Sequence, residues 1–118
     1  NAGTYAFPDV RVAWPYGMGN VKDAQVRIQD LLATKMLIAL GEADTKADAE
    51  AGVMDQSPEA NAQGLYRLAR GRAYFVACQD VADENNLQFN MTKREVPGVG
   101  HSADKMFNSQ QVLSYLME

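Results

Sequence analysis

The apolar positions of this chain predict a helix that leads directly into a buried strand. Asn20 is a suitable N-cap, and apolar residues then recur at helical spacing to about residue 32. These positions are Ala24, Ile28, Leu31 and Leu32. Residues 36–40 form a short continuous apolar run that ends at Gly41. A helix before such a run and another after it are typical of a strand buried on both faces of a parallel sheet.

A long second helix is predicted after this strand. Ser57 is placed to cap Pro58, and we expect the helix to run from there to about residue 84, with a bend at Gly64 or Gly71. Its expected buried stripe consists of Leu65, Leu68, Ala69, Val76 and Ala77.

A second strand and a last helix complete the pattern. Residues 89–96 have mixed polarity and predict a strand near a sheet edge, and a helix is expected from about residue 109 onwards. Residues 1–19 and 42–57 carry loop chemistry; the aromatic residues of the first segment favour packing over the wall of a substrate cleft. A strand–helix–strand unit in one sheet returns the second strand parallel to the first. The chain is therefore predicted to have an α/β fold, with parallel strands and flanking helices.

Several side chains of the second helix have ordinary structural interpretations. Arg67, Arg70 and Arg72 lie close together in sequence, and we expect them to be solvated or paired with nearby acids. The only cysteine, Cys78, is expected to be an inert residue on a helix face.

Composition limits the kind of domain and the classes of partner that this protein can have. The 118 residues, 47% hydrophobic and 22% charged, suit one compact domain or part of a larger one. Two or three strands make a poor independent sheet, so we expect a piece of a larger domain. A net charge of −4 without any Lys/Arg run argues against a nucleic-acid partner, and the longest apolar run is too short for a membrane span. One cysteine and one histidine give no disulfide framework and no recognised ligand spacing, so neither metal nor cofactor is expected.

An acid and an imidazole follow the two predicted strands. Asp44 comes four residues after Leu40, and His101, the only histidine, comes five residues after Val96. The carboxyl ends of parallel strands lie at one sheet edge, so these side chains can meet there as the Asp–His half of a hydrolytic triad. From spacing alone, Glu42 and Asp48 are rival acids, and a lone histidine in a glycine-rich loop is more often an ordinary surface or packing residue.

The same two stretches resemble the closing third of a bacterial α/β-hydrolase. They are Leu40-Gly41-Glu42-Ala43-Asp44-Thr45 and Val96-Pro97-Gly98-Val99-Gly100-His101-Ser102. The resemblance extends to Asn1-Ala2-Gly3-Thr4-Tyr5, Trp14-Pro15-Tyr16-Gly17, Gln63-Gly64 and Arg67-Leu68-Ala69-Arg70-Gly71-Arg72, so it covers essentially the whole chain. It implies that residues 1–118 are the C-terminal part of a single α/β-hydrolase domain. It also implies that Asp44 is the triad acid and His101 the triad base, acting on an ester-type substrate.

The nucleophile of that family is missing from this chain. The pattern Gly-x-Ser-x-Gly is absent, and so is the early glycine-rich loop that supplies an oxyanion-hole donor. The serines present, Ser57, Ser102, Ser109 and Ser114, do not lie in a strand-to-helix elbow. We therefore expect the missing N-terminal portion of the same protein to supply the serine.

Two other functions remain open at this point. The chain can belong to a non-catalytic binding protein of the same fold, in which the elbow serine is replaced. It can also be a small α/β interaction domain, in which Asp44 and His101 only pack.

Overall fold

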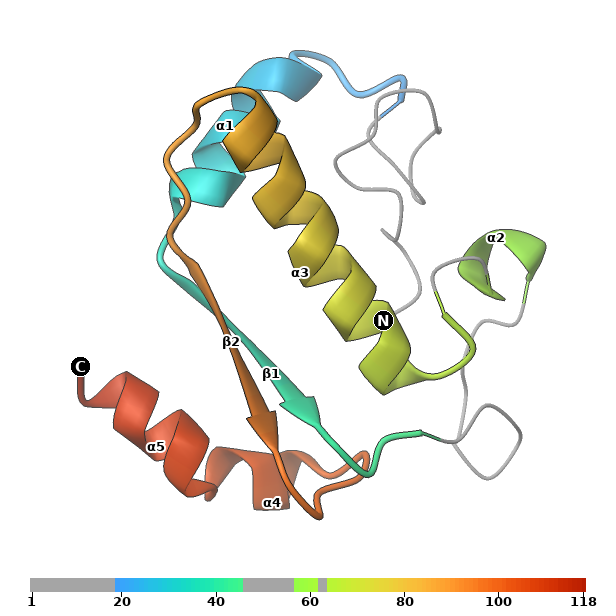
Figure 1. Cartoon of the computed structure of the whole chain (residues 1–118), viewed down its shortest axis with the longest axis vertical. Helices are drawn as coiled ribbons and strands as arrows, with labels where there is room; N and C mark the ends of the chain where they lie inside the picture. Colours follow the sequence, from blue (N-terminus) through green and yellow to red (C-terminus); the bar gives the residue numbers. More distant parts are fainter. Residues whose placement is uncertain (1–18, 46–56, 62–63) are drawn as a thin grey trace.

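The described part of the chain is a two-stranded parallel sheet with helices on both sides (Figure 1). The computed structural model describes residues 19–45, 57–61 and 64–118. The elements are α1 (Ala24–Ala33), β1 (Met36–Gly41), α2 (Pro58–Asn61), α3 (Arg67–Glu84), β2 (Met91–Val96), α4 (Ala103–Phe107) and α5 (Gln110–Leu116). This arrangement is the α/β fold that the pattern of apolar positions predicted. Most of the predicted loops 1–19 and 42–57 lies outside the described residues.

The register of the two strands brings their carboxyl ends together. Met36 pairs with Met91 at one end of the sheet, and Gly41 pairs with Val96 at the other. α3 connects the strands and packs against β1 and α1, whereas α4 and α5 lie on the other side of the strands (Figure 1). The segments that follow Gly41 and Val96 consequently start next to each other.

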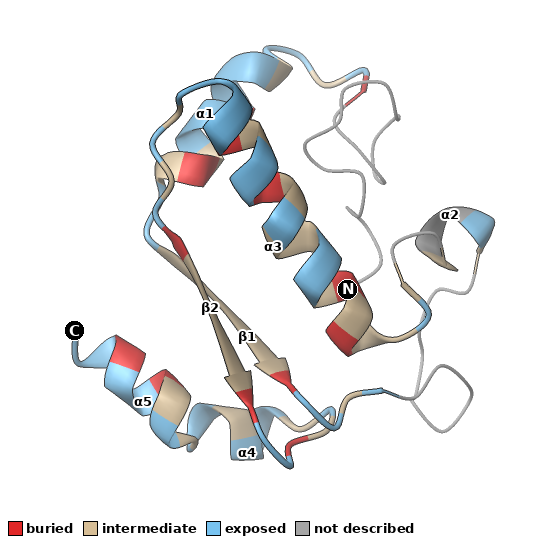
Figure 2. Ribbon diagram, viewed as in Figure 1, coloured by how far each residue is buried: buried red, intermediate tan, exposed pale blue. Residues whose placement is uncertain are grey.

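β1 is the more apolar of the two strands, yet most of its residues are only half-buried. Of residues 36–41 only Gly41 is buried (Figure 2). β2 pairs with one edge of β1, and no other strand in the described part of the chain pairs with the opposite edge. The pattern predicted a strand buried on both faces, whereas residues 36–40 are only half-buried, and among the described residues no strand pairs with the second edge of β1.

The predicted helix from 58 to 84 is divided into two helices. Gly64 lies between α2 and α3 with φ at +142°, a conformation that favours glycine and cannot continue a helix. Tyr66, the N-cap of α3, is extended, with φ at −147° and ψ at 166°. Gly71 lies within α3, so of the two predicted bend positions only Gly64 lies between the helices.

The buried stripe of α3 also differs from the predicted one. Leu68 is buried as expected, but Leu65 precedes the helix and is 60% exposed, and Val76 is 49% exposed. The buried positions of α3 are Leu68, Arg70, Cys78 and Ala82. Because α3 starts at Arg67, its contact face follows the spacing from Leu68 to Cys78 and Ala82.

Buried Arg70 is a further departure from the expectation of solvated arginines. Its side chain is 2% exposed, and its Nε donates to the carbonyl oxygen of Gly64 at 2.8 Å. Its Nη2 donates to Oδ1 of Asn61 at 3.2 Å. Arg70 thus ties the segment between α2 and α3 to the helix that follows it.

The other helix boundaries are close to those predicted. α1 begins at Ala24 after Asp23, so Asn20 is not its N-cap, and both Asn20 and Asp23 have positive φ. The last predicted helix corresponds to α5, which Ser109 caps. A short helix that the sequence pattern did not indicate, α4, precedes it.

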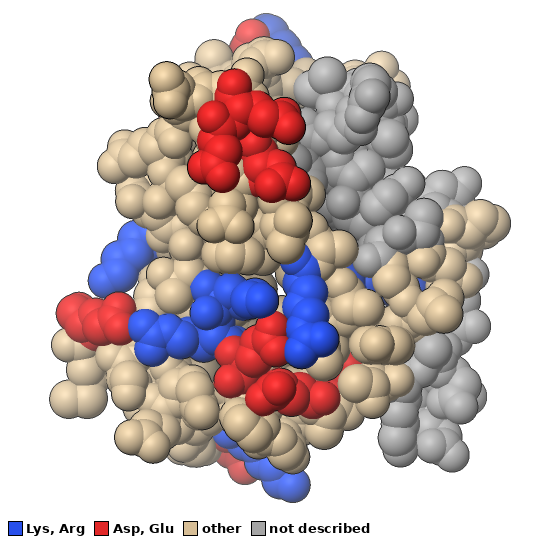
Figure 3. Space-filling model, in the orientation of Figure 1, with Lys and Arg blue, Asp and Glu red and all other residues tan. Residues whose placement is uncertain are grey.

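Ion pairs connect the polar strand β2 to its neighbours. Arg72 of α3 donates two hydrogen bonds to the Glu95 carboxylate, at 3.0 and 2.6 Å, and Lys93 lies 3.0 Å from the same carboxylate. The Arg72 guanidinium, helped by Lys93, lowers the pKa of Glu95 to about 2. Figure 3 shows basic and acidic side chains gathered together on this face.

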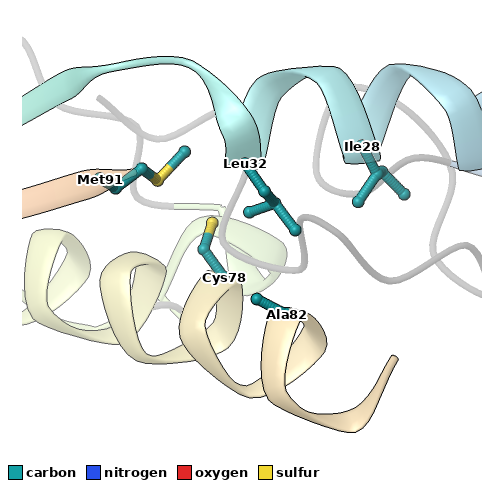
Figure 4. Packing of buried hydrophobic residues seen from close by; sticks show 5 residues of the cluster. All are labelled: Ile28, Leu32, Cys78, Ala82 and Met91. Carbon is teal, nitrogen blue, oxygen red and sulfur yellow. The ribbon is translucent and has the colours of Figure 1, made fainter. Parts of the chain in front are cut away.

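One cluster of buried apolar residues lies at the amino end of the strands. It is a cluster contributed by α1, α3 and the first residue of β2 (Figure 4). Its members are Ile28, Leu32, Cys78, Ala82 and Met91. Leu32 and Cys78 are fully buried, so this cluster fixes α1 and α3 against the start of the sheet.

Candidate active site

Asp44 is held immediately after β1 by main-chain hydrogen bonds. Its N–H donates to the carbonyl oxygen of Gly41 at 3.0 Å, which closes a turn after the strand. Its own carbonyl oxygen accepts from the N–H of Leu68, in the first turn of α3, at 3.1 Å. The Asp44 side chain is 14% exposed, so its carboxylate is largely shielded from solvent.

His101 is presented after β2 by a glycine turn. Gly98 adopts φ of +74° and redirects the chain just past Val96, and the N–H of Ser102 donates to the carbonyl oxygen of Gly100 at 2.9 Å. Ser102 then caps α4. The His101 side chain is 65% exposed, in contrast to its carboxylate neighbour.

The loops that carry the two side chains are bonded to each other. The N–H of Glu42 donates to the carbonyl oxygen of Val96 at 2.9 Å, and the N–H of Ala43 donates to that of Val99 at 2.9 Å. These bonds extend the pairing of β1 and β2 beyond the strands. The chain segments before Asp44 and His101 therefore have a fixed relative position.

These loop positions bring the Asp44 carboxylate into contact with the His101 imidazole. His101 Nδ1 lies 3.2 Å from Asp44 Oδ2. An ionised carboxylate only accepts hydrogen bonds, so Nδ1 is the donor in this contact, and in the neutral imidazole Nε2 then has the lone pair. Such an arrangement can take up a proton at Nε2 while the carboxylate stabilises the resulting imidazolium.

Arg67 faces the second oxygen of the same carboxylate. Its Nη1 lies 3.9 Å from Asp44 Oδ1, and the side chains of Arg67 and Asp44 are only 12% and 14% exposed. Asp44 is thus placed between a guanidinium and an imidazole. The sequence pattern offered pairing with nearby acids for Arg67 but did not indicate which acid, because the start of α3 decides where this side chain lies.

Two hollows meet at this pair. One, of about 240 Å³, is lined by Asp44, Arg67 and His101 together with Ser102 and Met106. The other, of about 430 Å³, shares the first three residues and continues along β1 beside α3. The pair therefore lines open space large enough for a reacting group.

The other candidate residues are placed differently. Glu42 is exposed, and Asp48 lies outside the described residues. Ser102 Oγ accepts the N–H of Lys105, and Ser109 Oγ accepts the N–H of Val112, so both serines serve as helix caps.

Cys78 has the chemistry of a core residue. Burial raises the pKa of its thiol to about 12, and burial also raises the pKa of the adjacent Tyr74 hydroxyl. A thiol with such a pKa carries almost no thiolate near neutral pH, so it is not an activated nucleophile.

The described residues contain neither a metal-binding cluster nor a membrane-spanning helix. Among these residues, no three or more His, Cys, Asp or Glu side chains are grouped as a metal ion would require. None of the helices within them combines the length and the apolar character needed to cross a membrane.

The fold matches that of solved hydrolases. Poly(aspartic acid) hydrolase-1 from Sphingomonas sp. KT-1 aligns over 92% of this chain and 40% of its own, with a TM-score of 0.80 and 31% identity. LpqC, a poly(3-hydroxybutyrate) depolymerase from Bordetella parapertussis, aligns over 97% of this chain and 38% of its own, with a TM-score of 0.83 and 29% identity. Both are hydrolases of the α/β-hydrolase type. The fold of this chain is of that type.

The extent of this similarity is partial. The chain spans about two fifths of the length of each of these two structures. No family model matches the sequence, and no curated protein matches it.

Proposed function

We propose that this chain supplies the acid and the base of a serine hydrolase that cleaves ester-type bonds by acyl transfer. Asp44 is the orienting acid and His101 is the general base. The observation that carries the proposal is the contact of 3.2 Å between His101 Nδ1 and Asp44 Oδ2, at the bonded carboxyl ends of two parallel strands. The similarity to two hydrolases of acyl polymers supports the same reaction class.

The geometry accounts for each proton in this reaction. As the serine Oγ bonds to the acyl carbon, its proton passes to His101 Nε2, and the Asp44 carboxylate stabilises the imidazolium. The imidazolium then gives this proton to the leaving alkoxide oxygen, which departs as an alcohol. Water attacks the acyl-enzyme in the second half, with His101 Nε2 again taking and returning the proton, and the acid product is released.

The proposal assigns the serine to a segment outside residues 1–118. On this proposal, residues 1–118 are the C-terminal part of a single α/β-hydrolase domain. The apolar strand β1 has an open edge among the described residues, next to the hollow of about 430 Å³. A preceding strand paired there would cover β1 and bring its own carboxyl end, and a serine following it, to the edge where His101 lies.

The test compares acid variants in the longer polypeptide that contains residues 1–118. With a p-nitrophenyl ester as substrate, Asp44→Asn is expected to lower kcat by about 10³–10⁴-fold, because the imidazole loses the acceptor that fixes its tautomer. Glu42→Gln, two residues away in the same loop, is the matched control and is expected to leave kcat unchanged. Equal activities for these two variants would remove Asp44 from the mechanism.

A second experiment separates the hydrolase from a non-catalytic binding protein. A fluorophosphonate probe is expected to label one serine of the longer polypeptide, outside residues 1–118, and His101→Ala is expected to abolish the labelling. A polypeptide that is neither labelled nor active on activated esters is not a serine hydrolase. Turnover of an activated ester by the purified 118-residue chain alone would contradict the assignment of the serine to another segment.

A further inference from the structure

Gly41, the last residue of β1, has no room for a side chain. A Cβ atom built on it would lie 2.2 Å from the carbonyl oxygen of Val99, 2.9 Å from that of Gly100 and 3.0 Å from the carbonyl carbon of Val99. All three are main-chain atoms of the loop that carries His101. Gly41 is absent from the residues with positive φ, so the requirement here is for space and not for an unusual backbone conformation.

The carbonyl oxygen of Val99, which a side chain at position 41 would meet first, also takes part in the hydrogen bonding between the two loops. The carbonyl oxygen of Val99 accepts the N–H of Ala43 at 2.9 Å. Ala43 directly precedes Asp44, and Val99 lies two residues before His101. A side chain at position 41 would push this carbonyl away and would carry the imidazole with it.

We propose that Gly41 is a positioning residue for the acid–base pair. Its missing side chain lets the loop after β2 lie directly against the end of β1, and this approach sets the separation of Asp44 and His101. The catalytic meaning of the inference rests on the proposed function, whereas its geometric content does not. The class of reaction remains acyl transfer at the same site.

Gly71 in α3 provides a matched control. A Cβ atom there would lie 2.2 Å from Leu40 Cδ2, with further contacts at 3.0 and 3.2 Å to the same side chain. The shortest distance equals that at Gly41, but the atom contacted here is the end of the Leu40 side chain, which can rotate. Alanine is also favoured over glycine within a helix. Gly71→Ala therefore adds the same methyl group close to β1 without displacing the loop of His101.

The first readout is kinetic, in the longer polypeptide that contains this chain. In Gly41→Ala the new Cβ atom and the carbonyl oxygen of Val99 must move apart by roughly 1 Å. A displacement of that size in a catalytic group can lower the rate about 10²-fold. We expect that fall in kcat with little change in KM, since the variant alters the acid–base pair and not the substrate contacts. Gly71→Ala is expected to keep the wild-type kcat, and circular dichroism checks that both variants are folded.

The second readout does not depend on activity. The Nδ1 proton of a histidine bonded to a carboxylate gives a far low-field NMR signal, and the signal of His101 is identified by its loss in His101→Ala. We expect Gly41→Ala to lose it and Gly71→Ala to keep it. If wild-type protein gives the signal but hydrolyses no ester, the proposed function fails while the positioning role stands.

Three outcomes would overturn the inference. The first is a Gly41→Ala protein with unchanged kcat and an unchanged low-field signal. The second is a wild-type protein without that signal, because there would be no contact to position. The third is a Gly41→Ala protein that does not fold while Gly71→Ala does, because Gly41 would then serve the fold as a whole.

Discussion

The two ends of the parallel sheet are held together by different interactions. At the amino end, α1 and α3 enclose side chains such as Leu32 and Cys78, which are fully buried. At the carboxyl end, Leu68, Val96 and Val99 are also buried, but main-chain hydrogen bonds connect the loops, and the His101 ring is 65% exposed. Apolar burial is non-directional and stabilises the fold, whereas hydrogen bonds between main-chain groups fix positions. The comparison indicates that the exposed candidate site lies at one end of the strands, away from the apolar cluster that fixes α1 and α3 at the other end.

The largest expected effect on this separation comes from Leu32→Ala. Removing a fully buried leucine side chain is expected to lower the free energy of unfolding by about 2–5 kcal/mol. Since Leu32 lies at the amino end, the kcat of the molecules that remain folded should not change. Urea denaturation measures the first quantity, and ester hydrolysis normalised to labelled serine measures the second.

Val26→Ala is the control for this prediction. Val26 lies in the same helix and is 57% exposed, so its truncation should change stability by no more than about 0.5 kcal/mol. A Leu32→Ala protein of normal stability with reduced kcat would mean that the two ends of the sheet are not separate.

Arg67→Met tests whether Arg67 helps to orient the Asp44 carboxylate at the carboxyl end of the sheet. The variant keeps an unbranched apolar stem but removes the cation that lies 3.9 Å from Asp44 Oδ1 in a largely shielded position. We expect kcat to fall about tenfold, equivalent to about 1.4 kcal/mol, because one side of the Asp44 carboxylate is then unrestrained. Arg72→Met, which removes a cation from the exposed pair with Glu95, should leave kcat unchanged. Equal kcat values for the two variants would exclude Arg67 from orienting the acid.

Glu95→Gln gives the smallest effect, and its sign depends on pH. The Arg72 guanidinium holds the pKa of Glu95 at about 2, below its ordinary value of 4.5. A depressed pKa means that the charged form stabilises the fold above pH 4.5 and that this contribution is lost as the pH falls towards 2. Wild type should therefore exceed Glu95→Gln in stability by at most about 1 kcal/mol at neutral pH.

Thermal unfolding of both proteins across this range measures the Glu95 contribution. The difference should shrink as the pH falls from 4.5 to 2 and disappear below pH 2, where the carboxyl is protonated in the folded protein as well. A difference that grows on acidification would contradict the sign. Glu118→Gln, at the exposed pair with Arg94, serves as the control.

The sequence predicts the carboxyl end of the sheet better than the course of the helices. The approach of Asp44 and His101 follows from two apolar strands and a connecting helix, since parallel strands end at one edge. The glycines predict a bend at Gly64 or Gly71 but not the complete separation of α2 from α3, in which the buried Arg70 side chain bonds the carbonyl oxygen of Gly64. No local propensity encodes that contact. Likewise, the apolar run of β1 predicts a strand that is buried on both faces. How far the strand is buried depends on which distant chain segments pack against it.

Arg67 and Gly41 illustrate the same limit within the candidate site. The contact of Arg67 with Asp44 requires α3 to begin at residue 67, whereas the sequence pattern continued one helix from residue 58. The close approach at Gly41 is set by a loop more than fifty residues later in the chain. Spacing along the sequence cannot give such a distance.

The connection between the two loops has a consequence for how freely this site can be altered. Its hydrogen bonds are donated by the N–H groups of Glu42 and Ala43, and the side chains of both residues are exposed. Every amino acid except proline has this N–H group. Residues 42 and 43 can therefore be randomised without proline while the acid and the imidazole keep their places.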